Sequence, residues 1–428
     1  MATASGARLR ILILTHPFPP MNAIGAHRPY AWARAWRDLG HEVEVVTPQK
    51  YAFDGALDLQ RDLSGIAVHE VPYVSRDAGS TPPGGVPSSV HRWEWLKTFT
   101  RRLRLRLGPF AEPRWLAYRP MLSRALSVAR ARPFDLIIAT SPPEVSLFVA
   151  RGLSHRTGTP WVADFRDLWF HDMLLYRWRI TARLAGVLNR AAVRGASVLI
   201  AVSRGLHARL ADYMGREVVI SYNGFVAEVQ PPAAWSDGKR RVVYTGRMYP
   251  GKRDPEPLFR ALARLRGSMP DIAQRLSVEF YGFDDPWLRA IIRRHAVEDC
   301  VQLHGFVPYR QSMAIQRGAD ALLFLDWMDV GAEGVLTGKL FEYLGSRRPI
   351  LALGPRKSSE AAQIIADTGA GTTLTTDDEI VAYLRELIAS PRRPDIAPER
   401  VAAYSRERQA LELLDAIVAR LPRLQPRR

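Results

Sequence analysis

The stretch RILILTHPFPPMNAIGAHRPYAWARAWRDLGHEVEVVTP, residues 10–48, decides the fold class. An apolar run from Leu9 to Leu14 predicts a buried strand, and a helical pattern follows from about Pro29 to Leu39. Residues 40–48 then alternate between apolar and polar side chains, as a half-buried strand does. This order of strand, helix and strand predicts two parallel strands joined by a crossover helix.

The same alternation continues along the chain and then starts again. Further strands are expected in FDLIIATSPP (134–143), TPWVADFRD (159–167), ASVLIAVS (196–203) and VVISYNGF (218–225). A second series comprises KRRVVYTGR (239–247), LSVEFYGF (276–283), CVQLHGFV (300–307), ADALLFLD (319–326) and RRPILALG (347–354), with helical stretches such as residues 254–266 between them. The sequence therefore predicts an α/β protein with two doubly wound parallel-sheet domains.

We place the two domains at residues 1–225 and 226–405. The polar stretch VAEVQPPAAWSDGKR, residues 226–240, is the predicted linker. Residues 399–421 predict one amphipathic helix, and the segment 406–428 is able to return to the N-terminal domain. Ligands of doubly wound sheets bind just outside the carboxyl ends of the strands, so we looked for polar motifs there.

Composition narrows the classes of protein. The 428 residues carry a formal charge of +17, which favours an anionic partner such as nucleic acid, acidic lipid or a phosphorylated small molecule. The single cysteine, Cys300, cannot form an internal disulfide, and no segment approaches the roughly 20 apolar residues of a membrane helix. We expect a soluble cytoplasmic protein.

Two nucleotide-binding motifs are excluded. Lys339 follows a glycine as in a phosphate loop, but the next residue is Leu340 and position 333 holds a glutamate where that loop needs a glycine. The first strand–helix turn, THPFPPMNAIGAHR, offers only Gly25 where a dinucleotide fingerprint needs three glycines.

Two other motifs follow predicted strands and suit phosphate. YTGRMYPGKRD, residues 244–254, combines glycine with several cations, and its alternative interpretation is a solvated basic loop. In TGKLFEYLG, residues 337–345, Lys339 and Glu342 share one helix face. They form either a surface salt bridge or a ligand clamp, in which the helix amides and the lysine meet phosphate while the carboxylate accepts sugar hydroxyls.

In this order, the segments resemble the retaining glycosyltransferases of the GT-B fold, in particular glycosyltransferase family 4. The resemblance covers nearly the whole chain, with Tyr222 standing where that family has a proline. Its motifs are PFPP with Gly25 and GHEVEVVTP (40–48), VSRGLHARL (202–210) with YNGF (222–225), TGR with GK (245–252), LHGFVPY (303–309) and TGKLFEYLGSRRPIL (337–351).

The resemblance implies roles for particular residues. Arg247 and Lys252 would balance the charge of the donor's diphosphate as it leaves. Glu342 would take the ribose hydroxyls, Val307 would touch the base through its backbone, and Gly25 would let its loop close over the phosphates. The implied donor-binding set is Gly25, Gly246, Val307, Glu333, Thr337, Gly338, Lys339 and Glu342. It also implies that no metal and no cofactor is needed, since the nucleotide sugar is the substrate.

The chain departs from the family pattern at two places. Many members carry a glutamate eight residues before Glu342, where this sequence has Gly334 and places Glu333 next to it. Many also have a histidine where this sequence has Arg166, so Asp167 becomes the catalytic candidate on that side. The pair Arg166–Asp167 is alternatively a structural ion pair. Further candidates on the acceptor side are Arg28, Arg166 and His171.

A basic and aromatic segment, residues 91–116, contains six arginines, among them Arg101, Arg102, Arg104 and Arg106, and three tryptophans. Such a mixture suits an interfacial helix on anionic lipid, or else a solvated insert whose aromatic rings pack on the domain. Because acceptors in the family are often lipid-linked or lipopolysaccharide sugars, the resemblance implies peripheral binding to the inner membrane face.

Two rival functions stay open at this stage. A nucleotide-sugar epimerase or hydrolase on the same fold would use the same diphosphate site. A basic nucleic-acid-binding protein is disfavoured, because the sequence has no zinc-ligand spacing, no aromatic RNA-binding signature and no DNA-reading motif.

Overall fold

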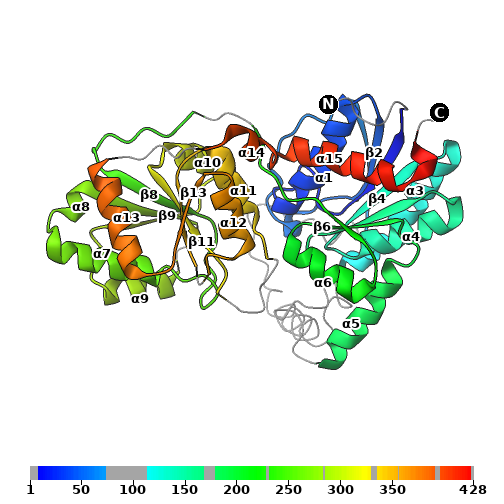
Figure 1. Ribbon diagram of the computed structural model, residues 1–428. Helices are drawn as coiled ribbons and strands as arrows, with labels where there is room; N and C mark the ends of the chain where they lie inside the picture. Colours follow the sequence, from blue (N-terminus) through cyan, green and yellow to red (C-terminus); the bar gives the residue numbers. More distant parts are fainter. Residues whose placement is uncertain are drawn as a thin grey trace, which may run out of the picture. The chain divides into compact units, whose positions relative to one another are not determined.

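The computed structural model describes residues 8–73, 113–167, 179–227, 231–282, 285–328, 335–354, 356–390 and 396–425 (Figure 1). The chain forms two compact units. One comprises Met1–Tyr222 with Ala410–Arg428, and the other comprises Asn223–Gln409. The boundary lies three residues before the predicted one, and the end of the chain from Ala410 belongs to the N-terminal unit.

The N-terminal unit contains a seven-stranded sheet in which the order is β3-β2-β1-β4-β5-β6-β7 and every pair is parallel. Its strands are β1 (Arg10–Leu14), β2 (Glu42–Pro48), β3 (Ile66–Val71), β4 (Leu136–Ser141), β5 (Trp161–Phe165), β6 (Val198–Ala201) and β7 (Val218–Ile220). The helices before residue 222 are α1 (Ile24–Asp38), α3 (Tyr118–Ala131), α4 (Val145–Thr157), α5 (Arg179–Ala192) and α6 (Arg204–Met214).

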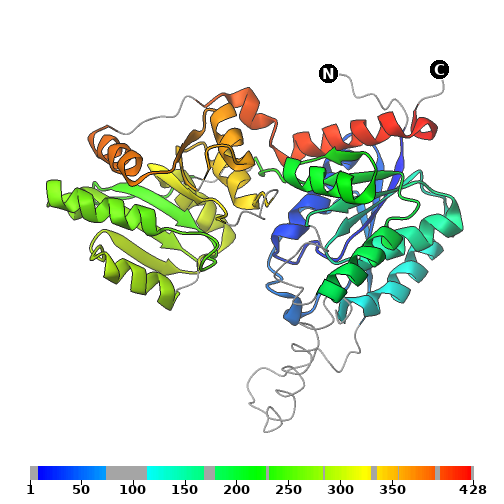
Figure 2. The same cartoon turned by 60° about the horizontal axis from the view of Figure 1, so that its bottom comes forward.

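Helices lie on both faces of this sheet (Figure 2). Successive residues of a strand point to opposite faces, and in β1 both sets are apolar after Arg10. Ile11 and Ile13 therefore join one core with α1, while Leu12 and Leu14 join another with α3 and α4. This double burial is why residues 11–14 are an unbroken apolar run in the sequence.

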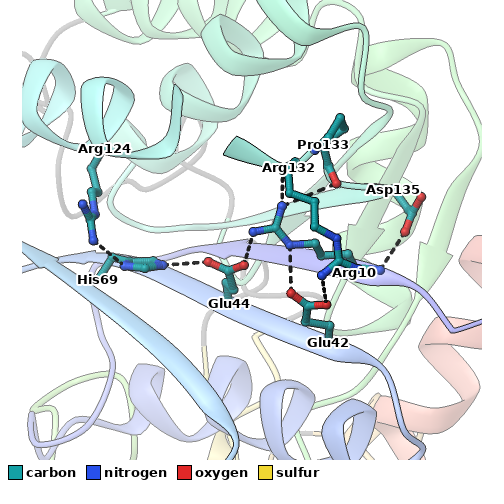
Figure 3. Close-up of polar contacts among 8 residues, drawn as sticks. All are labelled: Arg10, Glu42, Glu44, His69, Arg124, Arg132, Pro133 and Asp135. Atoms are coloured by element: carbon teal, nitrogen blue, oxygen red, sulfur yellow. Dashed lines mark hydrogen bonds and ion pairs between the residues drawn. The ribbon is translucent and has the colours of Figure 1, made fainter. Parts of the chain in front are cut away.

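The N-terminal unit also holds a network of charges around Arg10, at the start of β1 (Figure 3). The Arg10 guanidinium binds Glu42 at 3.1 Å and also pairs with Glu44, both on β2. Glu44 lies 2.7 Å from His69 of β3, and the Arg10 amide donates to Asp135 at 2.7 Å. The network links three adjacent strands and the segment before β4, so we interpret it as structural.

The C-terminal unit contains a six-stranded parallel sheet in the order β10-β9-β8-β11-β12-β13. Its strands are β8 (Arg240–Thr245), β9 (Leu276–Tyr281), β10 (Val301–Gly305), β11 (Ala321–Leu325), β12 (Ile350–Leu353) and β13 (Gly371–Leu374). Its helices are α7 (Glu256–Ser268), α8 (Ile272–Arg275), α9 (Pro286–Arg294), α10 (Tyr309–Gly318), α11 (Gly338–Ser346), α12 (Glu360–Asp367), α13 (Asp377–Ala389) and α14 (Pro398–Ala402).

The predicted single helix over 399–421 is wrong. Two helices occupy this region, α14 and α15 (Arg406–Arg420), with a break between them. At the break the backbone leaves the helical pattern to pair with Phe225, whose amide donates to Tyr404 and whose carbonyl accepts from the Arg406 amide at 2.9 Å. Beyond the break, Trp36 donates to the Ala410 carbonyl at 2.9 Å, and α15 buries apolar side chains in the same core as α1.

Helix α1 also differs from its prediction, because it starts at Ile24 and not at Pro29. Residues Gly25–Pro29 are all buried, and packing of a helix face commonly outweighs local preference. The early start brings Gly25 and Arg28 into the helix that follows β1.

Candidate functional site

The order of the strands reverses between β1 and β4 in one sheet and between β8 and β11 in the other. At such a switch point the loops after the two central strands diverge, which leaves room for a ligand at the carboxyl ends of the strands. Most of the predicted site residues follow these central strands, so each unit's switch point is a candidate site.

In the C-terminal unit three glycines follow adjacent strands. Gly246 comes after β8 with a φ of +112°, Gly282 comes after β9 with +154°, and Gly305 ends β10 with +70°. The Gly246 amide donates to the Tyr281 carbonyl and the Gly282 amide to the Gly305 carbonyl, each at 2.7 Å. A Cβ on Gly282 would overlap the Gly246 carbonyl. The three strands thus end in closely stacked backbone without side chains, which lets a ligand approach the main chain.

Lys339 lies in the first turn of α11 and points toward this backbone. Its Nζ is buried, has no hydrogen-bond partner and lies 3.4 Å from the centre of the Tyr244 ring. A Cβ on Gly246 would lie 3.1 Å from the same Nζ. Burial and the neighbouring Arg253 hold the pKa of Lys339 well below its usual range, and Glu342 opposes them.

The residue just before α11 adds a second unsatisfied group. Thr337 occupies the N-cap position, yet its hydroxyl makes no capping bond and is buried without a partner. Gly338, the first residue of the helix, is buried. The amides at the start of a helix favour an anion, and Lys339 adds a positive charge at the same place.

Arg253 is a residue that the sequence-based site did not include. It is 6% exposed, and its guanidinium lies 5.4 Å from the ring centres of both Tyr249 and Trp327. Its Nε is buried and has no hydrogen-bond partner. Its position directly after Lys252 in the basic loop could have suggested a role in the site. The sequence does not show, however, which of the two consecutive cationic side chains is buried.

Arg247 and Lys252, the predicted catalytic cations, lie in the same loop. Arg247 is exposed and Lys252 is half-buried. The Tyr244 hydroxyl donates to the Arg247 carbonyl at 2.9 Å, and the Lys252 carbonyl accepts from the Met328 amide, also at 2.9 Å. These bonds tie the loop after β8 to its own strand and to the segment after β11, so the backbone that carries both cations is held on two sides.

Glu342 has different surroundings from Lys339, although both are on α11. Its half-buried side chain lines a pocket, and burial raises the pKa of its carboxyl group against the influence of Arg406 and Lys339. The pocket is lined by Phe225, Val226, Tyr309, Arg310, Met313, Arg317, Glu342, Gly345 and Ser346. Lys339 and Glu342 do not form a surface salt bridge, because the lysine Nζ is buried and makes no hydrogen bond.

Val307, the predicted base contact, is half-buried in the loop between β10 and α10. Its neighbour Phe306 is 75% exposed. Two other predicted residues, Glu333 and His171, lie outside the described residues.

At the switch point of the N-terminal unit, Gly25 lies against Arg166. A Cβ on Gly25 would overlap the Arg166 guanidinium, which donates to the carbonyls of Ser141, at 3.3 Å, and Pro142. Gly25 therefore makes room for an arginine of the same unit. Asp167 follows Arg166, and desolvation raises the pKa of its carboxyl group, with Arg166 opposing.

Arg28 forms a buried ion pair with Asp164, the fourth residue of β5. The side chains are 3% and 0% exposed, and two guanidinium nitrogens reach the carboxylate, the closer at 2.8 Å. Thr140 donates to the same carboxylate at 2.7 Å, and Arg28 also donates to the Tyr222 carbonyl at 2.9 Å. Arg28, an acceptor-side candidate from the sequence, is thus bound within its own unit.

His16, just beyond β1, is a further buried group that sequence reasoning did not select. It is 1% exposed, its Nε2 makes no hydrogen bond, and the nearest carboxylate oxygen, on Asp54, is 3.6 Å away. Burial, with Lys50, Arg114 and Arg166, lowers the pKa of His16 to about 2. The ring is therefore neutral at neutral pH.

The described residues form two parallel-sheet α/β domains, and at the switch point of the second one the buried Lys339 Nζ and Arg253 Nε have no hydrogen-bond partner. Residues 25–224 match the family described as glycosyl transferase 4-like domain. No curated protein matches the chain in sequence.

Solved structures share the fold over nearly the whole chain. The HepE protein of Anabaena, solved with UDP, has a TM-score of 0.61 at 18% identity, covering 96% of this chain and 100% of that one. Sucrose-phosphate synthase from Thermosynechococcus elongatus has 0.58 at 13%, covering 96% and 99%. Trehalose 6-phosphate synthase from Burkholderia multivorans has 0.58 at 14%, covering 99% and 100%.

The fold prediction is therefore confirmed: the chain has the GT-B fold, and residues 25–224 match the glycosyl transferase 4-like domain. This domain match supports a glycosyltransferase. Within the described ranges, no helix has both the length and the apolar character needed to cross a membrane.

Proposed function

We propose that this chain is a retaining glycosyltransferase. It transfers a sugar from a nucleotide-diphosphate sugar to a saccharide or lipid-linked acceptor, in the biosynthesis of a cell-surface polysaccharide or glycolipid. The observation that carries the proposal is the buried Nζ of Lys339, which has no hydrogen-bond partner and lies next to the bare backbone at Gly246. A buried nitrogen at the start of a helix suits an anion, such as the diphosphate of a nucleotide sugar.

The proposed chemistry depends on positioning and charge. The donor's diphosphate lies against the loop after β8, where Arg247 and Lys252 neutralise the charge that develops as the sugar–phosphate bond breaks. The acceptor hydroxyl attacks from the face that the diphosphate leaves, and the leaving phosphate takes its proton, which retains the configuration of the sugar. Arg247 and Lys252 perform the neutralisation that a metal ion would otherwise provide, so we propose a metal-independent hexosyltransferase without a cofactor.

The donor can be identified by a thermal-shift screen of UDP, GDP, ADP and dTDP sugars. A ligand that binds only the folded protein raises its melting temperature in proportion to the logarithm of concentration over Kd. Because HepE was solved with UDP, we expect UDP sugars to give the largest shift. A protein that none of these nucleotide sugars stabilises would contradict the proposal.

Substitution Lys252→Ala tests the catalytic assignment. We expect turnover to fall by about 10²- to 10³-fold while donor affinity changes much less, because an oriented cation stabilises the transition state more than the ground state. The measurement is nucleoside diphosphate release at saturating donor. A matched control is Lys357→Ala, because Lys357 is an exposed lysine of the same unit and pairs with Glu379. Wild-type turnover in Lys252→Ala would remove this residue from the mechanism.

The alternative function is a nucleotide-sugar epimerase or hydrolase on the same fold. It would consume or isomerise the donor with no acceptor present, at a rate comparable to the transfer rate. Incubating the protein with the donor alone, and following the sugar by NMR, separates the two functions.

We also propose that the protein binds the inner membrane face through residues 91–116. The support is the basic and aromatic sequence of that segment, of which residues 91–112 lie outside the described residues. Flotation with vesicles that contain or lack anionic lipid tests it. Salt-sensitive binding to anionic vesicles is expected, and equal recovery with both kinds of vesicle would contradict it.

A further inference from the structure

A pocket of about 570 Å³ lies in the N-terminal unit, at the amino ends of β5 and β6. Its lining comes from α4, from Tyr118 of α3, from Trp161 at the start of β5 and from Arg194 and Gly195 just before β6. The switch point of this unit lies at the other ends of the strands, on the order of 13 Å away along the five residues of β5. The pocket is therefore separate from both switch points, and its volume suits a small molecule.

The lining of this pocket is basic. It contains Arg151, Arg156 and Arg194 as well as His155, and none of the described residues that line it is acidic. The Arg156 guanidinium donates to the Gly152 carbonyl at 2.8 Å. The side chains of Arg151 and Arg194 pair with no residue in the part of the chain that the structure describes. Because a cleft with charges of one sign attracts counter-ions, the occupant is an anion.

The number of donors favours phosphate over a single carboxylate. Each guanidinium presents a planar fork of N–H groups that matches two oxygens, and a phosphate monoester offers three oxygens with nearly two negative charges. The Tyr118 hydroxyl is a further donor, since it makes no hydrogen bond with the described residues. A Cβ on Gly152 would lie 3.1 Å from this hydroxyl, so the glycine within α4 makes room for it.

Aromatic side chains form the rest of the wall. Tyr118 and Phe148 are half-buried, and Trp161 is 1% exposed. The Phe148 ring is held from behind by Trp115, whose ring centre lies 5.0 Å away in an edge-to-face arrangement. Inorganic phosphate would leave these rings uncovered, whereas the organic part of a phosphate ester packs against them.

We propose that this pocket is a second ligand site, which binds a phosphate monoester. Arg151 and Arg194 bind the phosphate oxygens, and the aromatic rings contact the organic part. The inference goes beyond the proposed function, because none of the lining residues has a role in the sugar transfer. A soluble phosphate ester and the head group of a phosphorylated lipid share this chemistry, so the experiment has one arm for each.

The soluble arm is titration calorimetry of the full chain with phenyl phosphate. We expect Arg151→Gln and Arg194→Gln each to weaken binding by about 10-fold or more, through the loss of a charge-assisted hydrogen bond. Inorganic phosphate should bind about 3- to 10-fold more weakly than phenyl phosphate, because it has no ring. Lys339→Met, in the other unit, should leave the Kd for phenyl phosphate unchanged.

A matched control removes the same charge elsewhere in the N-terminal unit. Arg34→Gln lies on α1, which packs on the other face of the sheet, and the Arg34 side chain is 54% exposed. This variant should bind phenyl phosphate as the wild type does. Circular dichroism checks that each variant is folded.

The membrane arm is flotation with phosphatidylcholine vesicles that contain or lack phosphatidic acid. The double variant Arg151→Gln/Arg194→Gln is compared with Arg34→Gln. If only the double variant loses binding to phosphatidic acid, the pocket holds a lipid head group. If both variants float alike while phenyl phosphate binding depends on the two arginines, the ligand is soluble.

Dependence on Arg151 and Arg194 in either arm supports the site. Binding that depends on them in neither arm, or that falls only in Lys339→Met, would overturn the inference and leave the proposed function intact. A protein that binds phenyl phosphate in this pocket but is stabilised by no nucleotide sugar would contradict the proposed function alone.

Discussion

The carboxyl ends of the central strands differ between the two units, although both sheets are parallel and reverse their order in the same way. In the N-terminal unit the buried arginine, Arg28, meets a carboxylate of the same unit, Asp164, at 2.8 Å. In the C-terminal unit the buried cations, Lys339 and Arg253, each keep a nitrogen without a partner. A charge that is buried and paired is part of the fold, whereas a charge that is buried and unpaired indicates a ligand.

The glycines at the two switch points differ in the same way. At Gly25 the Arg166 guanidinium of the same unit occupies the space that a side chain would need. Gly246 borders the Lys339 Nζ, which has no hydrogen-bond partner. Glycine is therefore required at both edges, at one for packing and at the other next to the proposed phosphate.

The largest effect is expected when the carboxylate of the buried N-terminal ion pair is removed. Asp164→Ala leaves Arg28 buried without a counterion, and we expect the free energy of unfolding to fall by about 3–5 kcal/mol. Urea denaturation followed by circular dichroism measures it. The control is Asp38→Ala, in which a 53% exposed partner of Arg37 is lost. That change should lower the free energy of unfolding by less than about 1 kcal/mol. Equal effects of the two changes would show that the buried ion pair contributes no more to stability than the exposed one.

The second prediction concerns His16, the unpaired titratable group of the N-terminal edge. Its pKa falls from 6.5 in the unfolded chain to about 2 in the folded protein, so the unfolded state binds the extra proton between these values. The stability that this neutral ring contributes is complete above pH 6.5 and is lost as the pH falls. Between pH 7.5 and pH 5 we expect the free energy of unfolding to drop by about 2 kcal/mol through this group alone.

The measurement is the difference in pH dependence between the wild type and His16→Asn. The variant should lack this part of the acid destabilisation. His155→Asn, at an exposed position of α4, serves as the control and should follow the wild-type curve. An unchanged slope in His16→Asn would show that the buried ring does not cause the loss.

The smallest effect is expected from alanine substitution at two glycines in the loop after β8. Both have positive φ, +112° at Gly246 and +70° at Gly251, but a Cβ would approach Lys339 only at Gly246 and meets open space at Gly251. Alanine at either position should lower stability by about 1–2 kcal/mol through backbone strain. Only Gly246→Ala should also weaken nucleotide binding, measured by calorimetry. Equal binding by both variants would place the ligand away from Gly246.

Several elements were predictable because their signals are local. The strand β11 is entirely apolar, and β1 and β4 each contain an apolar run of four residues, so these strands can be predicted without knowing their partners. The strands β3 and β13 were not predicted, because they lie at the edges of their sheets, where most of their residues are only partly buried or exposed. The break between α14 and α15 depends on backbone pairing with Phe225, far away in the sequence, which no local pattern contains.

The sequence by itself determined two doubly wound parallel-sheet domains and the position of the glycine-containing basic loop after β8, since alternation and turn residues are properties of neighbouring positions. Only the tertiary structure decided which charges are paired. Arg28 and Asp164 are 136 residues apart in the chain, and Arg253 meets Trp327 across two loops. Whether a cation is part of the core or is left for a ligand depends on what surrounds it in space, because burial and counterions, and not residue type, set the free energy of a charge.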